Sequence, residues 1–222
     1  MELITYQGGR LRPAATIGMA TIKVIRTQHQ VSARLVRSYF ELRSNMRIPD
    51  RWVLNSPIDE HGREVDPWQF NEGRRLDLDA RLRLRVALPG RELDFSLTGL
   101  GIVVVHERVA RVLERMGVRD VQLIPVEVEG CSSAYFILSV LSTIRCIDDA
   151  RCEEVQHWKP EDGQPEKVGE YRVVAGMRID PTRVGDAHLF RPWGWSVALI
   201  VSDELKRALE HEGITGTRFI EV

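Results

Sequence analysis

The 222-residue sequence predicts an α+β fold, in which mixed or antiparallel sheets are accompanied by few helices. Two observations lead to this prediction. Residues 105–126 match residues 201–222 without a gap, so the chain contains one strand–helix–strand unit twice. Most other apolar stretches have the length and β-branched composition of strands, and they do not alternate with helices as in a doubly wound sheet. We therefore expect two similar lobes, each containing one strand–helix–strand unit.

The helix of each unit is predicted from its ends and from its apolar stripe. Acidic residues begin the helices, at Glu107 and Asp203, where the helix dipole favours negative charge. Gly117 and Gly213 fall at the position that commonly ends a helix. The stripes, with the i, i+3, i+4 spacing of a buried helix face, are Val109, Val112 and Leu113 in the first copy, and Leu205, Ala208 and Leu209 in the second. Two copies are too few for a solenoid.

Four further stretches are predicted to be strands, namely 76–90, 133–147, 171–180 and 194–201. The first alternates at Leu82, Leu84 and Val86, as a half-solvated strand does. The second is a long apolar run, which we expect to form a central strand or two strands with a bend at Ser139 or Ser142.

We divide the chain into three segments. Residues 1–35 lack a sustained period and are expected to form a poorly ordered basic arm. Residues 1–51 hold nine Arg and Lys against three acids. The first α+β lobe is then expected at 36–130 and the second at 131–222, the two together making one domain.

Composition argues against several broad classes of protein. Hydrophobic residues make up 43% and charged residues 28%, as in globular proteins. The formal net charge of −1 provides no overall field for nucleic acid. No window has the apolar length of a membrane span. Three cysteines, an odd number, without a recognisable secretory signal fit a reducing compartment. We therefore expect a cytoplasmic protein with no membrane partner.

The common catalytic motifs are missing. The sequence has no Walker phosphate loop and no G-x-S-x-G nucleophile elbow. The stretch "HERVA" begins like a zinc-protease motif, but Ala110 stands where the second histidine ligand is required. The six histidines are scattered singly. We expect no catalytic residue and no cofactor.

The segment "CIDDARCEEVQHW", residues 146–158, is the strongest candidate for a metal site. Five residues separate Cys146 from Cys152, whereas zinc thiolates favour loops of two to four residues, and no second pair completes a tetrahedron. The acids also lack the alternation and the central glycine of an EF-hand. We therefore interpret the segment as a solvated acidic connection without a metal.

Five tryptophans lie beside Pro, Gly or charged residues. We expect most of them to cover the edges of the core. Trp158, with acids close to it in the sequence, is the best candidate for a partner-binding anchor, because Trp is enriched at interface hot spots. Trp193 and Trp195 look structural.

Residues 36–222 resemble the eleventh family of bacterial immunity proteins, which accompany polymorphic toxins in competition between bacteria. The resemblance rests on stretches such as "PIDEHGREVDPWQF", "RVARVLERMGVRDVQLIPVEVEG", "YFILSVLSTIRCIDDAR" and "FRPWGWSVALIVSDELKRALEHEGITGTRF". It implies a non-enzymatic protein that binds and neutralises a cognate protein toxin by non-covalent occlusion. The family has no catalytic motif to transfer to this chain.

Such a role suggests a use for the acidic segment. Toxins that attack nucleic acids are often basic, so we expect the acidic surface to attract one and to steer its association. The candidate partner-binding residues are Asp148, Asp149, Glu153, Glu154 and Trp158.

Two alternatives stay open from the sequence. The first is a metal-dependent enzyme of an unrecognised kind, with "VHERV" and the acidic cluster as its polar groups. The second is a nucleic-acid-associated regulatory module that uses the basic arm around Arg26, Arg34, Arg37 and Arg43.

Overall fold

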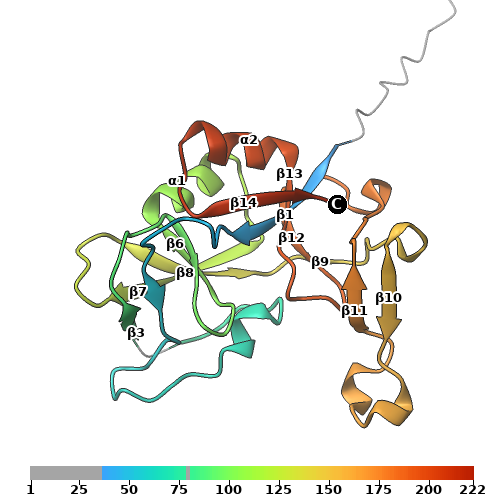
Figure 1. The fold of residues 1–222 in the computed structure, drawn as a ribbon, viewed down its shortest axis with the longest axis horizontal. Coiled ribbons are helices and arrows are strands. Elements are labelled where there is room, and N and C mark those ends of the chain that lie inside the picture. Colours follow the sequence, from blue (N-terminus) through green and yellow to red (C-terminus); the bar gives the residue numbers. More distant parts are fainter. Residues whose placement is uncertain (1–36, 79–80) are drawn as a thin grey trace, which may run out of the picture. The chain divides into compact units, whose positions relative to one another are not determined.

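The computed structural model describes residues 37–78 and 81–222 (Figure 1). Within them two helices accompany fourteen strands and five 3-10 turns. The strands are β1 (Tyr39–Ser44), β2 (Val53–Leu54), β3 (Leu82–Leu84), β4 (Val86–Leu88), β5 (Phe95–Leu97), β6 (Val103–His106), β7 (Val121–Val128), β8 (Tyr135–Val140), β9 (Thr143–Ile144), β10 (Glu154–His157), β11 (Tyr171–Ala175), β12 (Leu189–Pro192), β13 (Ile200–Ser202) and β14 (Thr217–Glu221). The helices are α1 (Glu107–Arg115) and α2 (Asp203–His211), and the 3-10 turns are η1 (Trp68–Asn71), η2 (Asp149–Arg151), η3 (Pro160–Asp162), η4 (Pro165–Lys167) and η5 (Pro181–Arg183).

Two five-stranded sheets carry the fold, and both are mixed. The first sheet has the order β3-β7-β8-β6-β5, and the second sheet has the order β14-β1-β13-β12-β9. Each contains one parallel pair, β3 with β7 and β9 with β12, beside antiparallel pairs. Two small antiparallel pairs, β2 with β4 and β10 with β11, complete the strands of the described residues. The predicted α+β class is confirmed.

The two strand–helix–strand units have the same structure. The bounds of α1 and α2 differ by the same 96 residues as the aligned sequences. Each helix begins after a capping side chain: His106 accepts a hydrogen bond from the Arg108 amide, and Ser202 accepts one from the Leu205 amide. Gly117 and Gly213 have φ of 67° and 62°, a left-handed conformation that ends a helix at little cost for glycine.

A third strand completes each unit, and it comes from the other half of the chain. In the first sheet β8 lies between β6 and β7, with Phe136 opposite Val105 and Pro125. In the second sheet β1 lies between β13 and β14, with Phe40 opposite Val201 and Glu221. All these positions correspond at the same offset of 96 residues. The chain is therefore a duplication whose two copies exchange their first strands, "YFELRS" in β1 and "YFILSV" in β8.

One core is shared by the two copies. It contains equivalent residues of both, such as Leu42 with Leu138 and Val109 with Leu205, all at most 7% exposed. The helices α1 and α2 both contribute to this core and are neighbours (Figure 1). Two further clusters of buried side chains lie around the first sheet, where Phe70 is fully buried, and around the second sheet, where Phe190 is fully buried.

Two strands lie in a sheet formed mainly by residues from the other side of the division predicted at residue 130. Strand β8 belongs to the first sheet and β1 to the second, because each pairs with the unit of the other copy. The division into lobes at 36–130 and 131–222 stays a prediction, and the predicted arm at 1–35 lies outside the described residues.

The other predicted strands differ in length from the observed ones. The run 133–147 forms two strands, β8 and β9, which enter different sheets after a break at residues 141–142. In 76–90 the alternating residues divide between β3 and β4. Of 194–201, the last two residues belong to strand β13, because the preceding residues form a turn that connects β12 to it.

Candidate functional site

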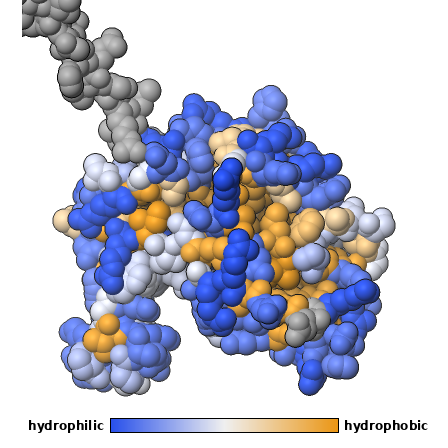
Figure 2. Space-filling view, turned by 180° about the vertical axis from the view of Figure 1, so that it is seen from behind, coloured by the Kyte–Doolittle hydropathy of each residue, from blue (hydrophilic) through white to orange (hydrophobic). Residues whose placement is uncertain are grey.

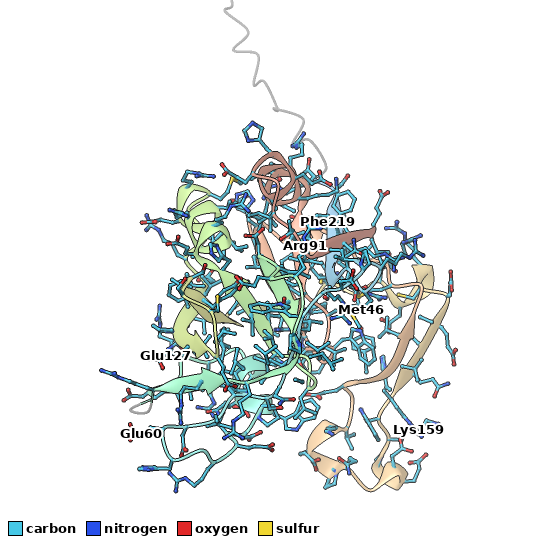
Figure 3. The ribbon with its side chains drawn as sticks, turned by 60° about the vertical axis from the view of Figure 1, so that its left-hand side comes forward. Met46, Glu60, Arg91, Glu127, Lys159 and Phe219 are labelled. Atoms are coloured by element: carbon cyan, nitrogen blue, oxygen red, sulfur yellow. The ribbon has the colours of Figure 1, made fainter. Side chains whose placement is uncertain are left out.

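The predicted partner-binding residues lie in and beside the β10–β11 hairpin. We call residues 148–172 the acidic hairpin: they contain eight Asp and Glu against four Arg and Lys. The hairpin extends away from the two sheets (Figure 1), and Lys159 marks its tip, on the other side of the view from Glu127 (Figure 3). Its surface is mainly hydrophilic (Figure 2). The five predicted residues therefore lie on one structural element, although they do not converge on one point.

Asp149 is held at the base of the hairpin. The Tyr171 hydroxyl donates a hydrogen bond to Asp149 Oδ1 at 2.8 Å, and His157 Nε2 lies 3.4 Å from Oδ2. The rings of His157 and Tyr171 are in contact, 4.6 Å between centroids. Burial raises the pKa of the Tyr171 hydroxyl, and the Asp149 carboxylate adds to this effect. Asp149 is exposed but fixed in position, while neighbouring Asp148 faces Arg151 at 3.9 Å.

Glu153 and Glu154 are exposed at the start of β10. The Glu153 side chain packs over Gly176, where an added Cβ would lie 2.3 Å from Glu153 Cγ. Glu154 Oε1 accepts a hydrogen bond from Nε2 of the Gln156 side chain at 2.6 Å. Neither side chain has a cationic partner among the described residues, and both are exposed to solvent.

Trp158 organises the tip of the hairpin. Its half-buried ring has the Lys167 ammonium at 5.4 Å and the Arg172 guanidinium at 5.3 Å from the ring centroid. Arg172 also pairs with Asp162 at 2.8 Å, and Asp162 caps η3 by accepting from the Lys159 amide. No residue of η3 or η4 is buried. The tip is thus ordered by its own contacts rather than by the core.

The cysteines and acids of this region do not converge. Cys146 is 1% exposed and packs among the apolar residues of the second sheet, where burial raises the pKa of its thiol to about 12. Cys152 accepts a hydrogen bond from the Arg178 amide at 3.3 Å. Within the described residues no three His, Cys, Asp or Glu side chains are grouped so as to hold a metal ion.

The polar groups of the first alternative are part of the fold. Besides capping α1, His106 lies 3.7 Å from the buried Asp94 carboxylate, which also receives the Arg108 guanidinium at 2.9 Å. Asp94 in turn bonds to Thr215 of the other copy. These residues connect the two copies to each other.

Two arginines of the second alternative can be placed. Arg37 pairs with Glu204 at 3.0 Å, and Arg43 pairs with Glu41 at 2.6 Å. Arg26 and Arg34 lie outside the described residues. Arg37 and Arg43 therefore both have carboxylate partners within this chain.

Trp68 belongs to the five tryptophans of which most were expected to cover the edges of the core. It is 63% exposed, because Phe70, two residues later, takes the buried position in η1. Trp68 and Trp193 line a cleft of about 350 Å³. The local sequence "DPWQF" indicates that one ring is exposed, since a single short turn can bury one of its two aromatic rings while it exposes the other.

Neither α-helix among the described residues has the length and apolarity needed to cross a bilayer. No curated protein matches the chain. The model of the family described as "Immunity protein family (Imm11)" matches residues 18–222, nearly the whole chain. The match begins before residue 36, so the likeness to the family includes part of the N-terminal segment, which was expected to lie outside it. The chain therefore belongs to the Imm11 immunity protein family.

Proposed function

We propose that this protein binds a cognate polymorphic toxin in the cytoplasm of the producing bacterium and neutralises it by non-covalent occlusion. Membership of an immunity protein family supports a toxin as the partner. The acidic hairpin is the surface that we assign to it. The observation that carries this assignment is an ordered tip whose 3-10 turns bury no residue.

An element of this kind is suited to recognition. Its strands are held by the β10–β11 pairing and its tip by Trp158, so little conformational entropy is lost when a partner binds. Its excess of carboxylates attracts a basic protein and accelerates encounter at low salt. A toxin that acts on nucleic acids would present such a basic surface, and the hairpin would cover it.

The test uses the C-terminal domain of the large secreted protein expected in the neighbouring reading frame. In the test variant Asp148 and Asp149 are changed to Asn, and Glu153 and Glu154 to Gln. Asn at position 149 retains an acceptor for the Tyr171 hydroxyl, so the hairpin keeps its structure. We expect association to slow by about 10-fold at low salt, with a weaker dependence on salt concentration.

The matched control neutralises four exposed acids elsewhere: Asp77→Asn, Glu114→Gln, Glu127→Gln and Glu129→Gln. It removes the same charge and should associate at nearly the wild-type rate. Equal rates for the two variants would exclude the acidic hairpin from the interface. If the wild-type protein failed to bind the toxin domain or to protect cells that express it, the proposed function itself would be wrong.

A further inference from the structure

A second surface feature lies next to the root of the acidic hairpin. The cleft of about 350 Å³ is lined by two indoles, Trp68 from η1 and Trp193 from the β12–β13 turn. Glu72 and Glu170 also line it, and Glu170 directly precedes β11 of the hairpin. The cleft is therefore formed by segments from both copies. Residues of η1 and Glu72 come from the first copy, and Thr143, Glu170 and the β12–β13 turn come from the second.

Buried contacts hold the walls of the cleft in place. Arg191 is 2% exposed, and its Nη2 donates to Asn71 Oδ1 at 2.7 Å, across 120 residues of sequence. Its Nη1 donates to the carbonyl of Ser196, and Nε has no partner among the described residues. Burial lowers the pKa of Arg191 to about 10, so the guanidinium stays charged at neutral pH. This buried cation ties η1 to the β12–β13 turn.

Two further contacts fix the other segments that line the cleft. A Cβ at Gly73 would lie 2.8 Å from Thr143 Oγ1, so the end of η1 lies directly against β9. The Tyr171 amide donates to the Gly194 carbonyl at 3.1 Å, which joins the hairpin root to the same turn. The cleft is thus formed before any partner arrives.

Two partly exposed indoles of this chain have cationic side chains over their rings. Trp193 carries the Arg145 guanidinium, 3.1 Å from its ring centroid, and Trp158 carries Lys167 and Arg172. Trp68 is the most exposed tryptophan of the described residues, and no cation of the described chain lies over its ring. An exposed indole beside carboxylates favours a cation with an apolar stem.

The charges around the cleft also favour a cationic ligand. Arg74 is engaged by Glu72 at 2.5 Å, and Arg145 covers Trp193. Glu170 has no cationic partner among the described residues, so one carboxylate of the lining is free to pair. Arg191 lies behind the wall, where its bonds to carbonyl and amide oxygens direct it away from this role.

From these contacts we propose that the cleft receives an arginine side chain of the partner, stacked on Trp68 and paired with Glu170. This inference rests on the proposed function, since the arginine would belong to the toxin that the acidic hairpin attracts. Arginine fits better than lysine, because its planar guanidinium stacks on an indole and pairs with a carboxylate at the same time. The hairpin then governs the rate of encounter, and the cleft governs how long the complex lasts.

A direct test uses N-acetyl-arginine amide as the probe and the indole N–H signals of the full chain in 15N-labelled form. We expect a saturable shift of the Trp68 signal, which is assigned by its loss in Trp68→Ala. N-acetyl-citrulline amide has nearly the same shape without the charge and should bind at least about 3-fold more weakly, as should the arginine probe with Glu170→Gln. Equal shifts with both probes, or no shift of Trp68, would overturn the proposal.

The second test measures the complex with the toxin domain. Trp68→Ala should raise the dissociation rate by at least about 10-fold and leave the association rate nearly unchanged. The matched control is Leu88→Ala, which removes a side chain of similar exposure (61%) on β4. Unchanged dissociation from a toxin that binds normally would overturn the cleft and leave the proposed function standing. If the toxin did not bind at all, the proposed function would fail, and the arginine probe alone would decide the cleft.

Discussion

Asp94 and Thr215, from different copies of the duplication, bind each other reciprocally. The Thr215 amide and hydroxyl both donate to Asp94 Oδ2, at 2.8 and 2.7 Å, and the Asp94 amide donates back to Thr215 Oγ1 at 3.0 Å. Asp94 is 7% exposed, and both of its oxygens also accept from Arg108. These hydrogen bonds fasten the start of β5 to the loop before β14.

Replacing Asp94 with Ala should lower the free energy of unfolding by about 3 kcal/mol, because the partly buried donors of Thr215 and Arg108 lose their buried acceptor. Urea unfolding followed by circular dichroism measures the change. Glu129→Ala, at an exposed position, is the control and should change stability by less than about 0.5 kcal/mol. A similar small change at both positions would show that the Asp94 network contributes little.

Gly216 is required by the close approach of two backbones. It has φ of 90°, and an added Cβ would lie 2.0 Å from the Phe95 carbonyl oxygen. Gly216→Ala should therefore cost about 3 kcal/mol or more, since a backbone segment has to move. Gly213→Ala provides the comparison: φ is 62° there, but nothing lies within 4 Å, so the expected cost is about 1 kcal/mol. Equal thermal stability of the two variants would contradict the steric explanation.

The buried thiol of Cys146 should make the protein less stable in alkali. Burial raises the pKa of this thiol from 9.0 to about 12. The neutral thiol is favoured in the folded state, so its contribution is complete below pH 9 and is lost as the pH rises toward 12. The expected slope is up to about 1.4 kcal/mol per pH unit.

Urea unfolding at pH 8, 9 and 10 tests this dependence. The curve of Cys146→Ala should fall less steeply above pH 9 than that of the wild type, whereas Cys152→Ala should follow the wild type. Parallel curves for the wild type and Cys146→Ala would rule out the thiol as the source of the decline.

The tip of the acidic hairpin should be dispensable for folding. Replacing residues 159–169 with Asn-Gly removes η3 and η4, which contain no buried residue, so the melting temperature should change by less than about 2 °C. Phe70→Ala, at a fully buried position, should cost about 4 kcal/mol and serves as the contrast. Strong destabilisation by the loop replacement would mean that the tip supports the core.

Much of the candidate surface was predictable from local sequence. The acids at 148, 149, 153 and 154 follow an apolar run that ends at Ile147, and exposed acids after a buried strand are the ordinary expectation. Trp158 was less predictable, because its cationic neighbours include Arg172, on the opposite strand of the hairpin. The Trp68 cleft was not predictable, since Trp68 and Trp193 are 125 residues apart and meet through the bonds of Arg191.

The sequence by itself determined the two helices and their caps, because helical periodicity, capping side chains and terminal glycines act within a few residues of one another. It also contains the duplication, including the shared "YF" of β1 and β8. Only the tertiary structure decided that these two strands change places. An alternating pattern specifies which face of a strand is buried, but equivalent strands of a duplicated chain present nearly the same face to either copy. The choice between them depends on long-range contacts such as Asp94 with Thr215, which exist only after the chain has folded.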